Sequence, residues 1–241
     1  SESYKNIPAT GEIRPGDKAI IIGAAGPMGQ MHTIRLVCAG VSDIAITGTD
    51  FDNERLESLG EKAFALADER GVNLELANPE IDSLEGETFS YFDIMAPVGA
   101  IVSQSVKDSM ADTIINIFAG IPAGTRQNID LDTYIRNRCY MFGTSGSRVS
   151  DMLIVLDKVL SGQLDTNCSV EAVSGMAGAI DGIRAVENRL FSGKIIVYPE
   201  LENMPLLKLT ELEEHYPTVY DKLTHGIWTK AAEDELLKVA K

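Results

Sequence analysis

Three glycines stand at every third position near the start of the sequence. Gly23, Gly26 and Gly29 belong to the segment Ile22-Gly23-Ala24-Ala25-Gly26-Pro27-Met28-Gly29. The apolar run 18–22 precedes them and apolar residues at helical spacing follow, so the pattern predicts a strand, a tight turn and a helix in that order. In folds that bind a dinucleotide, the turn at this place holds the pyrophosphate.

Each glycine of this turn has a physical task in binding a pyrophosphate. Gly23 permits a tight exit from the strand, Gly26 keeps a Cβ out of the path of the phosphates, and Gly29 lets the helix pack closely on the strand. The N-terminus of the helix adds unpaired N–H groups and a partial positive charge. The other residues expected to line the cofactor here are Ala24, Ala25, Pro27 and Met28. Packing alone can also produce such a turn, so a second feature is needed.

An acidic residue in the expected place supplies that second feature. Asp50 ends the second apolar run, about 20 residues after the last glycine, where a carboxylate accepts hydrogen bonds from both hydroxyls of an adenosine ribose. Its charge would repel a 2′-phosphate, so it favours NAD over NADP. Asp52 is the alternative ribose ligand if Gly48-Thr49 lengthens this loop, although it is better placed to cap the next helix. We prefer Asp50.

The far end of a bound NAD should lie where the later strands end. In a doubly wound sheet, the nicotinamide lies at the carboxyl ends of the second set of strands, near the point where the strand order reverses. The residues at these ends are Ala96, Pro97, Phe118, Ala119, Gly120, Gly143 and Thr144. Any one of them could instead be an ordinary loop residue. At the adenine end, Arg55 either covers the base or pairs with Glu54 or Glu57.

The elements that must position these residues alternate along the chain. Apolar runs at 18–22, 44–47, 72–76, 92–96, 113–118 and 138–142 predict strands, and amphipathic segments at 27–39, 52–70, 101–110, 147–160 and 179–189 predict helices. Strands separated by helices indicate parallel βαβ units with right-handed crossovers. Two halves of three strands predict an α/β fold with a doubly wound, mostly parallel sheet, as in the Rossmann fold. A strand at 194–198 is extra.

The chain changes character after Pro199. Glutamate and leucine dominate the segment 206–220, and Thr229 could cap a last helix. We therefore predict a dinucleotide-binding domain over residues 1–200 and a helical C-terminal extension over residues 201–241. The simplest role of this extension is packing, either against the domain or against a second subunit.

Charge and composition exclude several classes of partner. The 241 residues carry a formal net charge of −15, which would repel a nucleic-acid backbone. No apolar run approaches the roughly 18 residues needed to span a membrane. Three widely spaced cysteines favour the reducing cytoplasm over a disulfide framework. No spacing of cysteine and histidine indicates a metal site within this sequence.

Several segments resemble the cofactor domain of medium-chain, zinc-type alcohol and polyol dehydrogenases. The resemblance covers roughly residues 8–200 and is carried by Pro15-Gly16-Asp17, the glycine turn, Asp50 with Arg55-Leu56, Phe92-Asp93-Ile94, and residues 116–120, 151–162 and 194–199. Within that family, the sequence resembles the sorbitol dehydrogenase and sugar-phosphate reductase branches in particular. The resemblance implies an NAD(H)-binding domain of an oxidoreductase that transfers hydride between nicotinamide and an alcohol, polyol or sugar phosphate.

The resemblance also implies what this sequence lacks. In that family a separate N-terminal β-barrel domain carries the catalytic zinc ligands, and nothing here matches them. We therefore expect the isolated chain to hold NAD without turning over a substrate. Zinc-free quinone reductases share the spaced glycines and Ala24-Ala25, so zinc use by the full-length enzyme stays open, with a zinc polyol type preferred. The resemblance implies a homodimer, with the strand at 138–142 as the candidate edge for pairing.

Other functions remain as alternatives. An S-adenosylmethionine-dependent methyltransferase also uses a glycine turn and an acidic residue, but the paired second half disfavours it. A nucleotide-sensing interaction module could use the acidic tail for binding. A short-chain dehydrogenase is disfavoured because Tyr134 is followed at the required offset by Arg138 and not by lysine. We identify no general acid or base, and His32 reads as a capping or packing residue.

Overall fold

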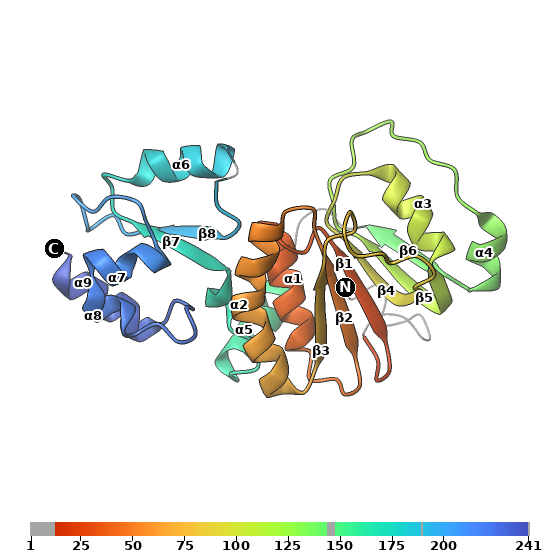
Figure 1. Ribbon diagram of the computed structural model, residues 1–241, viewed down its shortest axis with the longest axis horizontal. Helices are drawn as coiled ribbons and strands as arrows, with labels where there is room; N and C mark the ends of the chain where they lie inside the picture. The colour runs from red at the N-terminus through yellow and green to blue at the C-terminus, as the bar shows by residue number, and fades with distance from the viewer. Residues whose placement is uncertain (1–12, 144–147, 189, 241) are drawn as a thin grey trace. The chain divides into compact units, whose positions relative to one another are not determined.

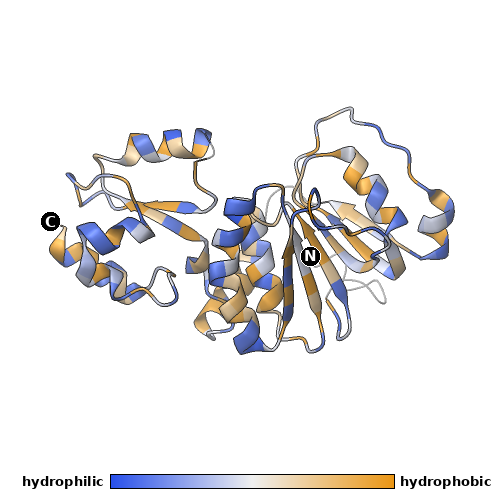
Figure 2. Cartoon of the chain, viewed as in Figure 1, coloured by the Kyte–Doolittle hydropathy of each residue, from blue (hydrophilic) through white to orange (hydrophobic). Residues whose placement is uncertain are grey.

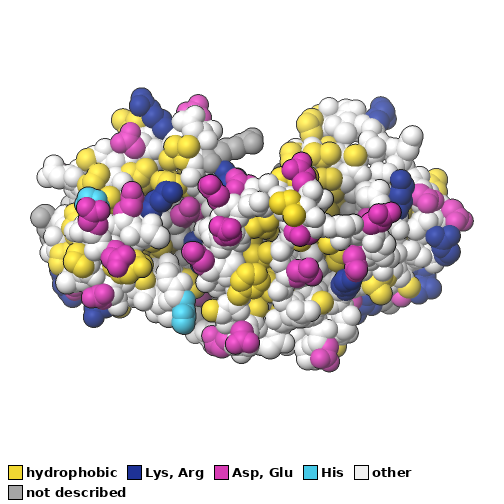
Figure 3. Space-filling model, viewed as in Figure 1, with side chains coloured by type: hydrophobic (Ala, Val, Ile, Leu, Met, Phe, Trp, Pro, Cys, Tyr) yellow, Lys and Arg dark blue, Asp and Glu magenta, His cyan; other side chains and the backbone are white. Residues whose placement is uncertain are grey.

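The computed structural model describes residues 13–143, 148–188 and 190–240, which form two compact units (Figure 1). The first unit ends at Leu164 and the second begins at Asp165. Acidic side chains are scattered over the visible face of both units in Figure 3. The negative charge is thus spread over that face, which favours dispersal in solution.

The first unit is built on a six-stranded parallel sheet. Its strands are β1 (Lys18–Ile22), β2 (Ala45–Thr49), β3 (Asn73–Ala77), β4 (Phe89–Ile94), β5 (Ser109–Ile117) and β6 (Tyr140–Gly143). Their spatial order is β3-β2-β1-β4-β5-β6, and every neighbouring pair is parallel. The order reverses between β1 and β4, as in the doubly wound dinucleotide fold. The predicted fold class is confirmed.

The α-helices among the described residues of this unit are α1 (Pro27–Val37), α2 (Asn53–Arg70), α3 (Gly99–Lys107), α4 (Leu131–Arg136) and α5 (Val149–Leu160). The sheet lies between α1 and α2 on one side and α3 and α4 on the other (Figure 1). The strands are largely apolar, whereas α2 has an apolar and a polar face (Figure 2). Buried side chains of α3, including Val106, share one core with Phe92 and Ile115 of the sheet. Burial of these apolar faces stabilises the layered arrangement.

Several element boundaries differ from those predicted. Gly48-Thr49 belongs to β2 and does not lengthen the following loop. A Cβ on Gly48 would lie 2.8 Å from Cδ2 of Leu76 and 3.0 Å from Cβ of Ala24, so glycine lets the strand pass beneath the turn. β4 spans 89–94 in place of 92–96, and Met110 lies in β5 and not in a helix. The short helix α4 was not predicted.

The second unit contains a separate sheet with the order β8-β7-β9. Its elements are β7 (Val170–Ser174), α6 (Ala179–Glu187), β8 (Lys194–Val197), β9 (Leu207–Lys208), α7 (Leu212–His215), α8 (Pro217–Tyr220) and α9 (Lys230–Val239). The strand predicted as extra therefore pairs with β7, a strand that the sequence did not predict. Thr229 caps α9 as expected, because its Oγ1 accepts a hydrogen bond from the N–H of Ala232 at 3.0 Å.

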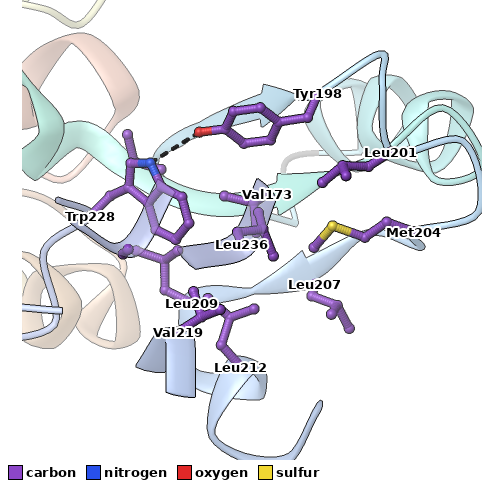
Figure 4. Close-up of a cluster of buried hydrophobic side chains, with 12 residues drawn as sticks. Val173, Tyr198, Leu201, Met204, Leu207, Leu209, Leu212, Val219, Trp228 and Leu236 are labelled. Carbon is purple, nitrogen blue, oxygen red and sulfur yellow. Dashed lines mark hydrogen bonds between the residues drawn. The ribbon is translucent and has the colours of Figure 1, made fainter. Parts of the chain in front are cut away.

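The C-terminal tail and β7 share one core, shown in Figure 4. Trp228 is 1% exposed, and its indole N–H donates to the hydroxyl of Tyr198 at 3.1 Å. That hydroxyl donates in turn to Oε2 of Glu233 at 2.9 Å. The predicted boundary between residues 200 and 201 thus falls inside a continuous core, because apolar residues on both sides of it pack together.

Candidate dinucleotide site

The glycine segment forms the turn between the end of β1 and the start of α1. Gly23 has a φ of +88°, a left-handed conformation that favours glycine. The N–H groups of Gly23 and Ala24 both donate to the carbonyl of Thr49, at 2.8 and 2.9 Å. Ala24 and Ala25 are fully buried, whereas Pro27 is exposed and Met28 is half-buried. The turn is therefore anchored to the carboxyl end of β2.

The three glycines face different surroundings. A Cβ on Gly29 would lie 2.0 Å from the carbonyl oxygen of Gly23, so the helix can pack on the turn only with glycine there. A Cβ on Gly26 would meet nothing nearer than 3.6 Å. Gly26 is also the N-cap residue of α1 and offers no side chain to the first-turn N–H groups. The open backbone at Gly26 suits a pyrophosphate, which needs close approach and free donors.

Asp50 lies beside this turn. Its Oδ2 accepts a hydrogen bond from the N–H of Ala25 at 3.2 Å, and its Oδ1 accepts from the N–H of Phe51 at 2.9 Å. The residue is half-buried, so part of the carboxylate stays accessible. A carboxylate has about four acceptor positions, which leaves capacity for a ligand hydroxyl.

Asp52 has a different task. Its Oδ1 accepts a hydrogen bond from the N–H of Arg55 at 3.2 Å, which makes Asp52 the N-cap of α2. Its Oδ2 lies 3.2 Å from Nε of Arg55. Arg55 thus forms an ion pair with Asp52, a partner that the sequence did not suggest. Of the two candidate ribose ligands, Asp50 is the one in contact with the turn.

Hydrogen bonds beyond the strand ends align the loops at the same edge of the sheet. The N–H of Met95 donates to the carbonyl of Ile22 at 2.9 Å. The N–H groups of Phe118 and Ala119 donate to the carbonyl of Ile94 at 3.1 and 2.9 Å. The loops that follow β4 and β5 therefore continue the ladder of the sheet. They lie at the same edge as the glycine turn.

The other predicted residues at this edge are more exposed. Ala96 is half-buried, and its backbone N would lie 3.6 Å from a Cβ on Gly23. Pro97 and Gly120 are exposed, as is Gly143 at the end of β6. Thr144 lies outside the described residues. The structure thus brings Ala96, Phe118 and Ala119 to the edge that carries the glycine turn.

A row of polar side chains under these loops was not predicted as part of the site. Nδ1 of His32, on α1, lies 2.6 Å from Oδ2 of Asp93, on β4. Nδ2 of Asn116, on β5, donates to Oδ1 of Asp93 at 2.8 Å. Asp93 and Asn116 are paired in register across the two strands. The signal that could have revealed them is a polar residue next to the last position of each of two apolar strands.

The surroundings of this row affect a neighbouring phenol. Burial, and next the negative charge of Asp93, raise the pKa of Tyr91 above its usual range. Tyr91 therefore stays protonated. The Oδ1 atom of Asn116 is buried and has no hydrogen-bond partner among the described residues. The His32 ring packs edge-on against Phe118, with centroids 4.6 Å apart and an angle of 64°.

The described residues contain no group of three or more histidine, cysteine and acidic side chains placed to hold a metal ion. Cys38, Cys139 and Cys168 are all buried, and none of them is joined in a disulfide. In the same part of the chain, none of the helices has both the length and the apolar character that crossing a membrane requires.

Two curated proteins are similar to nearly the whole chain. One, from Aliivibrio fischeri, is described as mannitol-1-phosphate 5-dehydrogenase and is 27% identical over 253 residues, covering 94% of this chain and 57% of that protein. The other, from Escherichia coli (strain K12), is described as "Uncharacterized protein YggP" and is 25% identical over 245 residues, covering 93% and 57%. The chain therefore spans little more than half the length of these relatives. No protein-family model matches it.

Solved structures share the fold over a similar share of their length. 2R,3R-butanediol dehydrogenase from Bacillus subtilis has a TM-score of 0.62 and 18% identity, over 79% of this chain and 53% of that chain. Acetophenone reductase from Geotrichum candidum, solved in complex with NAD, has a TM-score of 0.54 and 15% identity, over 77% and 49%. Over the aligned part, the chain has the fold of about half of an alcohol dehydrogenase, as the sequence resemblance predicted.

Proposed function

We propose that this chain is the NAD(H)-binding part of an oxidoreductase that acts on an alcohol, a polyol or a sugar phosphate. The observation that carries the proposal is the placement of the Asp50 carboxylate against the backbone of the open glycine turn at Gly26. This arrangement offers donors for a pyrophosphate and, beside them, an acceptor for ribose hydroxyls. The NAD complex among the structural neighbours supports the same cofactor.

The residues of this chain would bind and orient the cofactor. The first turn of α1 would hold the pyrophosphate, and Asp50 would accept from the adenosine ribose and repel a 2′-phosphate. The loops at Ala96-Pro97 and 118–120 would line the nicotinamide, with Gly143-Thr144 next along the same edge. When bound, NAD supplies the hydride acceptor that alcohol oxidation needs.

We propose that the groups which activate the substrate come from further protein outside this chain. Its relatives are nearly twice as long, and two helices expose apolar side chains that further protein could cover. The exposed residues are Met152, Leu153, Ile154 and Leu156 on α5, and Ile180, Ile183 and Val186 on α6. Any catalytic zinc would be held by that further protein. Alone, the chain would bind cofactor and turn over no alcohol.

We also propose a cytoplasmic homodimer. β6 stands last in the order of the six-stranded sheet, and the family resemblance implies that two copies pair through this strand. The three buried cysteines, none of them in a disulfide, are suited to a reducing compartment. Light scattering across a concentration series would test the dimer, and a constant monomer mass would refute it.

Titration of the purified chain with NADH, followed by cofactor fluorescence, tests the proposed function. We expect saturable binding that Asp50→Asn weakens by about tenfold, because a charge-assisted hydrogen bond is lost. Asp52→Asn is the matched control, since asparagine caps a helix as well as aspartate does, and it should leave the affinity unchanged. Absence of binding at millimolar NADH, or thermal stabilisation by S-adenosylmethionine and not by NAD, would overturn the proposal.

A further inference from the structure

Burial of the polar side chains of Asp93 and Asn116 inside the sheet carries a cost in desolvation free energy. Asp93 is 2% exposed and Asn116 is 9% exposed, and both stand in strands whose other inner residues are mostly apolar. A buried carboxylate is tolerated only when other groups donate hydrogen bonds to it. Here those groups are the imidazole of His32 and the amide of Asn116. His32 therefore compensates the buried charge of Asp93.

The same contact fixes the orientation of the His32 ring. With Asp93 as acceptor, the Nδ1 atom must carry a proton, and the ring cannot rotate without breaking that hydrogen bond. The ring makes a T-shaped contact with Phe118, the first residue of the loop after β5. Phe118 is half-buried, and its backbone N–H is bonded to Ile94, the residue that follows Asp93.

The row thus connects both ends of the proposed site. His32 lies on α1, whose first turn faces the pyrophosphate position, and Phe118 belongs to the loop assigned to the nicotinamide. We propose that His32, held by Asp93, is a positioning residue that fixes Phe118 and its loop for the nicotinamide ring. This inference rests on the proposed NAD-binding function.

A positioning role of His32 and a purely structural role differ in the ligands whose binding they affect. If the polar row merely stabilised the fold, its loss would weaken the binding of every part of the cofactor equally. If His32 positions the nicotinamide loop, its loss weakens the binding of NADH and leaves the binding of ADP-ribose unchanged. ADP-ribose has the same phosphates and adenosine and lacks the nicotinamide. The ratio of the two dissociation constants therefore separates the two roles.

Isothermal titration of the whole chain with NADH and with ADP-ribose is the test. His32→Asn keeps an N–H donor near the position of Nδ1 and removes the ring, whereas Phe118→Leu removes the other ring of the pair. We expect each variant to raise the Kd for NADH about fivefold, the size expected from the loss of one aromatic contact, and to leave the Kd for ADP-ribose within about twofold. The double variant should be no weaker than either single variant.

The fluorescence of bound NADH gives a second readout, since it reports the surroundings of the nicotinamide and should fall in both variants. His215→Asn, the same change at an exposed histidine of the second unit, should match the wild type. Equal losses for both ligands, or unchanged NADH affinity in Phe118→Leu, would overturn the positioning role. Failure of the wild-type chain to bind ADP-ribose would instead refute the proposed function, and the inference with it.

Discussion

The carboxylate of Asp50 and the backbone N–H of Ala25 are joined by a 3.2 Å hydrogen bond between the end of β2 and the glycine turn. The bond links two segments that lie 25 residues apart in the chain. Because Thr49, the neighbour of Asp50, also accepts from Gly23 and Ala24, the turn and the carboxylate form one rigid unit. A ligand that binds at the turn therefore has the Asp50 carboxylate beside it.

The charge of Asp50 should determine which cofactor binds. Asp50→Ser removes the negative charge and leaves a small hydroxyl in its place. We expect the ratio of NADH to NADPH affinity to fall by about tenfold or more, because repulsion of the 2′-phosphate is relieved while a ribose acceptor is lost. Competitive titration of the two cofactors measures this ratio. An unchanged ratio would show that Asp50 does not face the ribose.

Substitution of Gly26 should leave folding intact and weaken the binding of NADH. Aspartate is a favourable N-cap, so Gly26→Asp should leave the free energy of unfolding unchanged or raise it by roughly a few tenths of a kcal/mol. Its carboxylate would occupy the free donors and repel phosphate, so NADH affinity should fall by on the order of a hundredfold. Gly26→Asn, the neutral counterpart, should bind NADH better than Gly26→Asp. A stable Gly26→Asp variant with wild-type affinity would contradict the site.

Gly29 should show the reverse behaviour. A Cβ at this position would lie 2.0 Å from the carbonyl oxygen of Gly23, so Gly29→Ala must displace α1 from the turn. We expect a loss of about 3 kcal/mol or more in the free energy of unfolding, measured by denaturant titration. Gly120→Ala is the control, since nothing lies within 4 Å of its Cβ position, and it should change stability by less than about 0.5 kcal/mol.

The first unit was predictable because its signals are local. Each strand is a short apolar run, and the glycine turn marks the first crossover, so strand order followed from the general rules of βαβ folds. The boundaries around Gly48 were wrong because close packing against Leu76 and Ala24 decides them, and that packing is not local. The same packing brings Asp50, and not Asp52, to the turn.

The second unit and the polar row were not predictable in this way. The sequence of β7 is Val-Glu-Ala-Val-Ser, in which only the two valines are strongly apolar. The residues of β8 that pair with it lie more than 20 residues away. Likewise, Asp93 meets Asn116 only through the register of β4 with β5, and meets His32 only through the packing of α1. Pairings of this kind depend on the whole fold.

The contacts of Glu233 should make the stability of the second unit depend on acid. Lys230, and next Tyr198, lower the pKa of Glu233, because both donate to its carboxylate. A carboxylate with a lowered folded pKa stabilises the protein above its unfolded pKa, and this contribution is lost as the pH falls through the folded value. The Glu233→Gln variant should therefore be less stable than the wild type at pH 7.

Trp228 makes this measurable, because it is the chain's single tryptophan and is buried beside Tyr198. We expect Glu233→Gln to cost about 1 kcal/mol at pH 7, a modest value because Glu233 is partly exposed to solvent. The difference should shrink as the pH falls through the lowered pKa of Glu233, where the wild-type carboxylate takes up its proton. Glu235→Gln, on the same helix, is the matched control, since its 3.5 Å contact with Lys238 is longer and should contribute less. If the free energies of unfolding of the wild type and of Glu233→Gln differ by the same amount from pH 7 to pH 3, the role assigned to Glu233 is wrong.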